Sequence, residues 1–299
     1  QNLPAYVVLR DPDGYTIGGK QLWANAFLPA LYQGVEFSTR GAPIHHLNPP
    51  VALPPGVQRA NLDFLQKLNA AHLRDRPGES ELEARIENFE LAARMQLEAP
   101  NVLDLSGETN ATRKLYGLDN PATAKYGTRC LMARRLVESG VRFVQVFPPA
   151  TPDFQPWDSH SKLNKGLRKI CGQVEQPSAA LITDLKQRGL LEETLIIWGG
   201  EFGRTTYCQG ELKPKFGRDH HPRCFNIWMA GGGIKGGITL GQTDDYGYNI
   251  VADAVHVHDF QATVLHCLGI DHEKLTFRFQ GRDQRLTDIG GQVVTELLS

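Results

Sequence analysis

Short apolar runs rich in β-branched residues alternate with longer segments of helical periodicity along this chain of 299 residues. The runs are typical of buried strands, whereas the longer segments carry apolar residues every three or four positions, as amphipathic helices do. We expect strands at 5–9, 141–147, 194–198 and 225–230, and helices at 58–74, 80–97, 121–139, 163–188 and 258–268. This alternation predicts an α/β fold with a mostly parallel sheet sandwiched by helices.

The length fits one large domain, and we expect 1–299 to form it, with 57–120 as a helical insert or lid. Ser80 and Glu83 resemble a capping box at the start of the second helix of this insert. The chain opens without Met directly on an apolar strand, which favours an N-terminally truncated domain.

Charge and cysteine content exclude several classes of function. The formal net charge is -1, which gives no electrostatic footprint for nucleic acid, and no apolar run approaches a membrane span. The five cysteines contain no CxxC pair, so a zinc ribbon or a disulfide scaffold is not expected. The chain also lacks a GxSxG elbow and the GK[ST] of a phosphate-binding loop, which disfavours the usual serine hydrolases and P-loop enzymes.

Three polar clusters lie in loops next to the predicted strands, where the open sheets of α/β proteins place their sites. The candidate side chains in them are Asp158, His160, Glu201, Arg204, Arg218, Asp219, His220 and His221. Carboxylates mixed with imidazoles suit zinc, manganese or iron, whereas all-oxygen sites favour calcium or magnesium. The clusters therefore predict a divalent metal ion of one of these five kinds. Arg204 or Arg218 is placed to grip a tetrahedral oxyanion.

Not every histidine, carboxylate or hydroxyl group in or near these clusters is expected to take part in the site. Two adjacent histidines do not easily bind one ion, so we expect one of His220 and His221 to be a ligand. His45 and His46 form another loop pair, which is more typical of exposed turn residues. Asp259, near the start of a helix, suits capping better than catalysis. Thr205 and Ser159 are nearby hydroxyl groups that we expect to be structural.

Several motifs in one order resemble the bacterial family called domain of unknown function fifteen-oh-one. They are 157–160 (WDSH), 198–205 (WGGEFGRT), 217–222 (GRDHHP), 230–237 (AGGGIKGG), 257–269 and 280–288. The family is similar to sulfatases, alkaline phosphatases and cofactor-independent phosphoglycerate mutases, and its members often carry a twin-arginine export leader. The resemblance implies an alkaline-phosphatase-like, sulfatase-like core, a periplasmic or otherwise exported protein, and hydrolysis of sulfate or phosphate esters.

The resemblance also implies roles for single residues. Asp158 and His160 match an Asp and a His that hold one metal ion in that superfamily, and His220 or His221 matches a late His ligand. Glu201 lies where those enzymes have an Asp, but Phe202 replaces their following His. Their first Asp ligand and their nucleophile belong to a segment that precedes the start of this chain.

Three functions from different classes are compatible with these residues. The first is a metal-dependent hydrolase acting on a small-molecule or carbohydrate ester. The second is a non-catalytic module that binds polyanions or sugars on a degraded hydrolase fold. The third is an inactive partial gene product. The hydrolase predicts that Asp158, His160, Glu201 and one late histidine converge.

Overall fold

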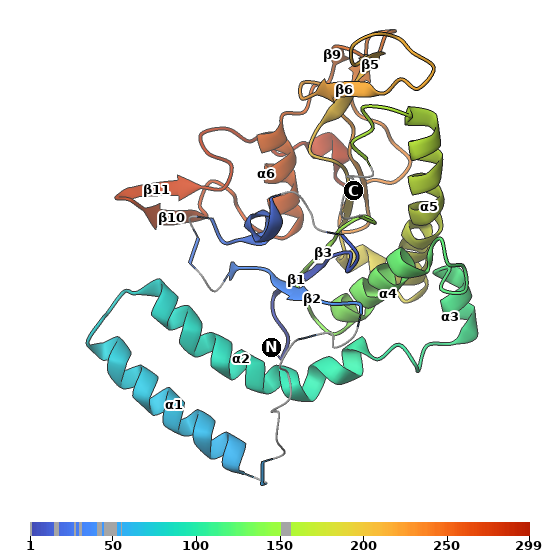
Figure 1. Ribbon diagram of the computed structural model, residues 1–299. Helices are drawn as coiled ribbons and strands as arrows, with labels where there is room; N and C mark the ends of the chain where they lie inside the picture. Colours follow the sequence, from blue (N-terminus) through green and yellow to red (C-terminus); the bar gives the residue numbers. More distant parts are fainter. Residues whose placement is uncertain are drawn as a thin grey trace. The chain divides into compact units, whose positions relative to one another are not determined.

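The computed structural model describes residues 2–14, 18–26, 28–29, 32–40, 44, 53–54, 56–150 and 157–299, which form a mixed α/β fold (Figure 1). The chain divides into two compact units. The first, called unit 1, comprises Gln1–Phe154 and Gly172–Leu181, and the second, unit 2, comprises Gln155–Cys171 and Ile182–Ser299. The single-domain organisation of 1–299, with 57–120 as an insert, stays a prediction.

The elements of unit 1 are β1 (Tyr6–Leu9), η1 (Gly19–Trp23), β2 (Val35–Phe37), α1 (Val57–Arg74), α2 (Ser80–Leu103), α3 (Asn110–Leu115), α4 (Ala124–Glu138) and β3 (Phe143–Val146). α5 (Leu163–Gln187) has residues in both units. Unit 2 contains η3 (Leu191–Glu193), β4 (Ile196–Trp198), β5 (Gly203–Cys208), β6 (Arg218–His221), β7 (Trp228–Ala230), β8 (Gln242–Thr243), β9 (Ile250–Ala252), α6 (Val257–Cys267), β10 (Thr276–Phe279), β11 (Arg282–Arg285) and η4 (Thr295–Leu297).

Unit 1 is built on a parallel sheet in the order β2-β1-β3. The predicted opening strand is confirmed as its central strand, in which Val7, Val8 and Leu9 are completely buried. A central parallel strand is covered on both faces, which explains why its sequence is continuously apolar rather than alternating. Val7 and Leu9 share one core with Leu136 of α4, and each such burial contributes about 1.5–3 kcal/mol.

The predicted helices at 58–74 and 80–97 are confirmed as α1 and α2, but α2 is longer than its periodicity suggested. It continues through Pro100 to Leu103. A proline inside a helix costs about 3 kcal/mol, and burial of Met95, Val102 and Leu103 in the core offsets this cost. The residue at the N-cap of α2 is Glu79, which makes no side-chain capping bond, and Ser80 is the first residue of the helix. The capping box of Ser80 and Glu83 stays a prediction.

In unit 2 the described strands pair only as two-stranded antiparallel ladders. β4 and β7, which we expected in a mostly parallel sheet, pair antiparallel with Ile197 opposite Met229. A parallel pair needs a crossover connection, usually a helix, on one face of the sheet. The chain between β4 and β7 forms the β5–β6 hairpin instead, so β7 returns in the opposite direction. The α/β class is confirmed, whereas a single mostly parallel sheet is not found among the described residues.

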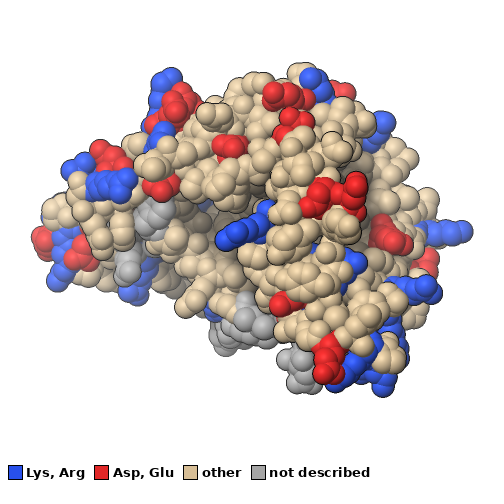
Figure 2. Space-filling view, turned by 90° about the horizontal axis from the view of Figure 1, so that it is seen from above, with Lys and Arg blue, Asp and Glu red and all other residues tan. Residues whose placement is uncertain are grey.

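The surface and helices agree with the charge and hydropathy of the sequence. Acidic and basic side chains are interspersed on the face that Figure 2 shows, as the net charge of -1 suggests. Within the described ranges, no helix combines the length and the apolar character needed to cross a membrane.

Candidate metal site

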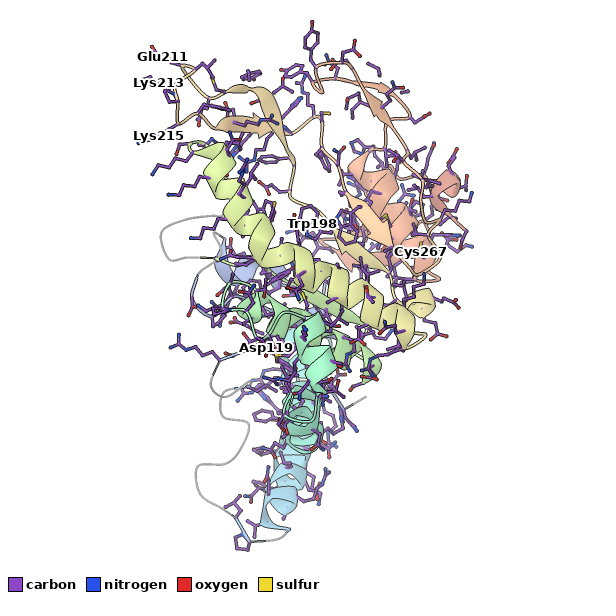
Figure 3. All side chains as sticks on the ribbon, turned by 90° about the vertical axis from the view of Figure 1, so that its right-hand side faces the viewer. Asp119, Trp198, Glu211, Lys213, Lys215 and Cys267 are labelled. Atoms are coloured by element: carbon purple, nitrogen blue, oxygen red, sulfur yellow. The ribbon has the colours of Figure 1, made fainter. Side chains whose placement is uncertain are left out.

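The β5–β6 hairpin of unit 2 brings two candidate residues to the same face. Arg204 of β5 lies directly opposite His220 of β6, while Gly203 lies opposite His221. Side chains alternate along a strand, and those of directly opposed residues share a face. His220 and Arg204 therefore project together, and His221 projects to the other side. Glu211, Lys213 and Lys215 lie at the outer end of the hairpin loop (Figure 3).

Backbone hydrogen bonds hold the segment before α5 against this hairpin. The amide of Arg218 donates to the carbonyl of Ser159 at 3.0 Å, and the amide of Leu163 donates to the carbonyl of Phe216 at 3.0 Å. Gly217 permits this approach, because a Cβ there would lie 2.0 Å from the carbonyl carbon of His160. At the start of the segment, Trp157 packs edge-on against Trp198 of β4, with ring centroids 5.7 Å apart.

This arrangement brings Asp158, His160 and His220 together as a possible metal-binding triad. Asp158 Oδ1 lies 2.9 Å from His160 Nε2 and 3.0 Å from His220 Nε2. The two Nε2 atoms lie 3.1 Å apart. Atoms that bind one zinc, iron or manganese ion at about 2.1 Å, with angles of about 90° to 110°, lie roughly 3.0 to 3.4 Å apart. The triangle is therefore close to the size that such an ion requires.

The chemical types of the three side chains also fit a bound cation. A neutral imidazole has one nitrogen with a free lone pair, and a carboxylate only accepts. The two histidines and Asp158 can thus direct three lone pairs at one positive ion. Two imidazoles and one carboxylate form a combination common to zinc and non-haem iron sites. The geometry and chemistry of the triad both fit a divalent metal ion.

His220 and Arg204 stabilise the charged form of Asp158. Arg204 Nη1 donates to the same Oδ1 that faces the two histidines, and Arg204 Nη2 lies 3.6 Å from Glu201 Oε1. Partial burial raises the pKa of Asp158, but hydrogen bonds from His220 and Arg204 and the guanidinium charge outweigh this effect. The net result is a pKa below the usual range, so Asp158 is ionised at neutral pH.

The other predicted ligands lie outside the triad. The side chain of Glu201 is 65% exposed and approaches Arg204. His221 is buried, stacks on the ring of Tyr248, and its Nε2 lies 2.7 Å from the Tyr248 carbonyl oxygen. The carboxylate of Asp219 accepts from the backbone amide of His220 at 2.8 Å. Of the adjacent histidines, the structure therefore brings His220 into the triad.

Most of the remaining candidates also lie in the part of the chain that the structure describes. Arg218 is exposed and lies two residues before His220, hence on the same face of β6. Thr205 is buried, accepts from the Asp219 amide and donates to the Tyr207 carbonyl, a structural arrangement. The expected role of Asp259 is confirmed by its capping box with His256. His45 and His46 lie outside the described residues.

Sequence reasoning missed the aromatic support of the triad. The ring of Phe202 lies 4.9 Å from that of His220, and the Arg204 guanidinium lies 5.9 Å from the Phe202 ring. Phe202 therefore packs against a candidate ligand. Its position two residues before Arg204 was an available signal, because residues two apart in extended chain share a face.

Comparison with known families agrees with the motifs. A family model described as protein of unknown function (DUF1501) matches residues 1–298. The chain belongs to the DUF1501 family. No curated protein and no solved structure matches this DUF1501 chain.

Proposed function

We propose that this DUF1501 protein is a metal-dependent hydrolase of sulfate or phosphate esters, with an alkaline-phosphatase-like core. The observation that carries the proposal is the triangle formed by Asp158, His160 and His220, with sides of 2.9 to 3.1 Å. The ester class comes from the resemblance of the family to sulfatases and phosphatases. An exported location belongs to the same proposal.

The ligand types favour zinc, iron or manganese over calcium or magnesium. Two imidazole nitrogens and one carboxylate oxygen are softer donors than the all-oxygen shells that calcium and magnesium prefer. Such an ion would act as a Lewis acid and stabilise negative charge on an ester oxygen. Asp158, His160 and His220 would hold it.

Arginines around the triad have separate roles in this proposal. Arg218 is exposed on the face of β6 that carries His220, so it is placed to bind the anionic oxygens of an ester. Arg204 bonds to Asp158 and Glu201, so it competes with a metal ion for Asp158 Oδ1. Phe202 packs against the ring of His220 and restricts its orientation. Arg218 is therefore the candidate for substrate binding, and Arg204 is a competitor for the metal ligand Asp158.

The first test is the metal content of the purified protein and of three ligand variants, measured by inductively coupled plasma mass spectrometry. We expect near-stoichiometric metal in the wild type, and its loss in Asp158→Asn, His160→Ala and His220→Ala. Glu201→Gln and His266→Ala are matched controls, because both side chains are exposed and outside the triad. Circular dichroism verifies that each variant is folded. A folded wild-type protein without metal would contradict the proposed site.

The second test is hydrolysis of p-nitrophenyl sulfate and p-nitrophenyl phosphate by the metal-loaded protein. We expect turnover of one of these esters, lost in His160→Ala and reduced in Arg218→Gln with the metal retained. Bound metal without turnover of either ester would refute the hydrolase and leave the metal site standing.

A further inference from the structure

Unit 1 contains a cavity of about 410 Å³, and none of its lining residues belongs to the metal triad, which is part of unit 2. This volume is within the range of small-molecule sites. The cavity lies beyond the carboxyl ends of the parallel strands β1 and β2, which Figure 1 shows side by side. Open α/β sheets bind their ligands at this edge. Its polar lining consists of Asp13, Thr39, Arg40, Lys125 and Thr128.

Two cations from different elements converge in this cavity. Arg40 follows β2, Lys125 belongs to α4, and both contact the carboxylate of Asp13 after β1. Arg40 Nη1 lies 3.0 Å from Asp13 Oδ1, and Lys125 Nζ bonds to Oδ2. The three side chains together carry one net positive charge. Both cations are largely exposed, so these pairs contribute little to stability and either cation can turn toward another anion.

The start of α4 adds to the positive potential of the cavity. α4 has 15 residues, and its first turn contains no acidic side chain. Acidic residues are favoured at that end of a helix, because the exposed amides there give it a partial positive charge. Here Lys125 occupies the first turn instead, and the hydroxyl of the preceding Thr123 donates to the Gly117 carbonyl rather than capping the helix. The sequence thus leaves this helix end without a negative partner of its own.

A buried network holds the loop that carries Asp13. Asp11 is 2% exposed, and its carboxylate accepts from the amide of Asp13 at 2.9 Å and from Arg129 Nη2 at 3.0 Å. The amide of Ala150 donates to it as well, at 3.2 Å. These bonds fix the turn after β1, so that Asp13 has a defined position at the cavity wall. A rigid wall reduces the entropy lost when a ligand binds.

We propose that this cavity binds a small phosphate or sulfate group, free or as an ester, through Arg40 and Lys125. The two cations grip the oxygens of the group, and Asp13 opposes binding because it competes for both cations. Once an anion is bound, each cation exchanges an exposed ion pair for a charge-assisted bond to a more highly charged partner. The proposal does not depend on the metal-dependent hydrolase, since the residues of the two sites lie in different units.

The test is isothermal titration calorimetry of the full chain with inorganic phosphate at constant ionic strength. The protein is first treated with a chelator that removes metal ions, so that phosphate cannot bind to a metal at the triad. We expect Lys125→Gln and Arg40→Gln to weaken phosphate binding by at least about fivefold each, as the loss of one charged bond requires. Lys67→Gln removes an equal charge from the exposed surface of α1 and should leave the affinity unchanged.

Asp13→Asn gives the sharpest outcome, because it is expected to strengthen phosphate binding by releasing both cations. Asp75→Asn, which removes an equal charge after α1, is the control for the change in net charge. Glycerol 2-phosphate in a parallel titration distinguishes a site for esters from one for the free ion. Phosphate affinity that is equal in all variants would overturn the proposal, as would a loss of binding in His160→Ala but not in Lys125→Gln.

Discussion

The buried pair of Asp11 and Arg129 leads to a quantitative prediction about unit 1. The Arg129 side chain is 0% exposed and that of Asp11 is 3% exposed, so both charges are shielded from water. Asp11 accepts from two backbone amides besides Arg129. Arg129 has Asp11 as its charged partner, and its Nε and Nη1 have no hydrogen-bond partner among the described residues. Arg129 therefore depends on Asp11 for compensation of its buried charge more than Asp11 depends on Arg129.

Asp11→Asn leaves the Arg129 cation buried without a counter-charge. Loss of one partner from a buried ion pair costs about 3–5 kcal/mol. Arg129→Met leaves Asp11 with its two amide donors, so we expect a smaller loss of about 1–3 kcal/mol. The double variant Asp11→Asn with Arg129→Met has no buried charge left at this position. We therefore expect it to be more stable than Asp11→Asn alone, in which the Arg129 cation stays buried without a partner.

Hydrogen–deuterium exchange measured on peptides from β1 and α4 reports the opening free energy of unit 1 without interference from unit 2. A loss of 3 kcal/mol or more corresponds to protection reduced at least about a hundredfold in Asp11→Asn. Peptides from α6 in unit 2 serve as the internal control. The reasoning is refuted if Asp11→Asn reduces protection less than Arg129→Met, or if the double variant is the least protected of the three.

Three further predictions concern the triad. Arg204→Gln should tighten zinc binding roughly thirtyfold in a competition titration with a chromophoric chelator, because like charges about 4 Å apart in water repel by about 1 kcal/mol and a divalent ion doubles this to about 2 kcal/mol; equal or weaker affinity would contradict competition for Asp158 Oδ1. Since the folded-state pKa of Asp158 is depressed, its contribution to stability is present above its ordinary pKa of 3.8 and is lost as the pH falls below that value. Urea midpoints below about pH 4 should therefore fall more steeply in wild type than in Asp158→Asn, and parallel curves would count against the assignment. Gly217→Ala should lower metal affinity in a folded protein without changing any ligand, because its Cβ would lie 2.0 Å from the carbonyl carbon of His160; unchanged metal content would show that this close approach does not position the triad.

Much of the local structure followed from the sequence alone. The apolar run that ends at Leu9 predicted the central strand of unit 1. The helical patterns predicted α1, α4, α5 and α6 nearly to their observed bounds. These features depend on side chains close together in the chain, whose periodicity matches that of a strand or helix. The same local reasoning directed attention to the segments that contain Asp158, His160 and His220, although it expected loops and His220 lies in strand β6.

Features that depend on distant packing were not available from the sequence. α2 extends past Pro100 because its last turns bury apolar side chains in a core formed by segments far away in the chain. The direction of β7 relative to β4 depends on how the intervening hairpin returns, and a short apolar run has no signature of parallel or antiparallel pairing.

The triad, too, was predictable from the sequence in part and depends on the tertiary structure for the rest. The sequence by itself determined which segments of an α/β chain are rich in carboxylates, imidazoles and guanidinium groups; it predicted loops there, but 203–208 and 218–221 form strands β5 and β6. Only the tertiary structure decided that His220 joins Asp158 and His160, while His221 stacks on Tyr248. The physical reason is the alternation of side chains along β6, whose phase is set by its pairing with β5 and cannot be read from two adjacent histidines.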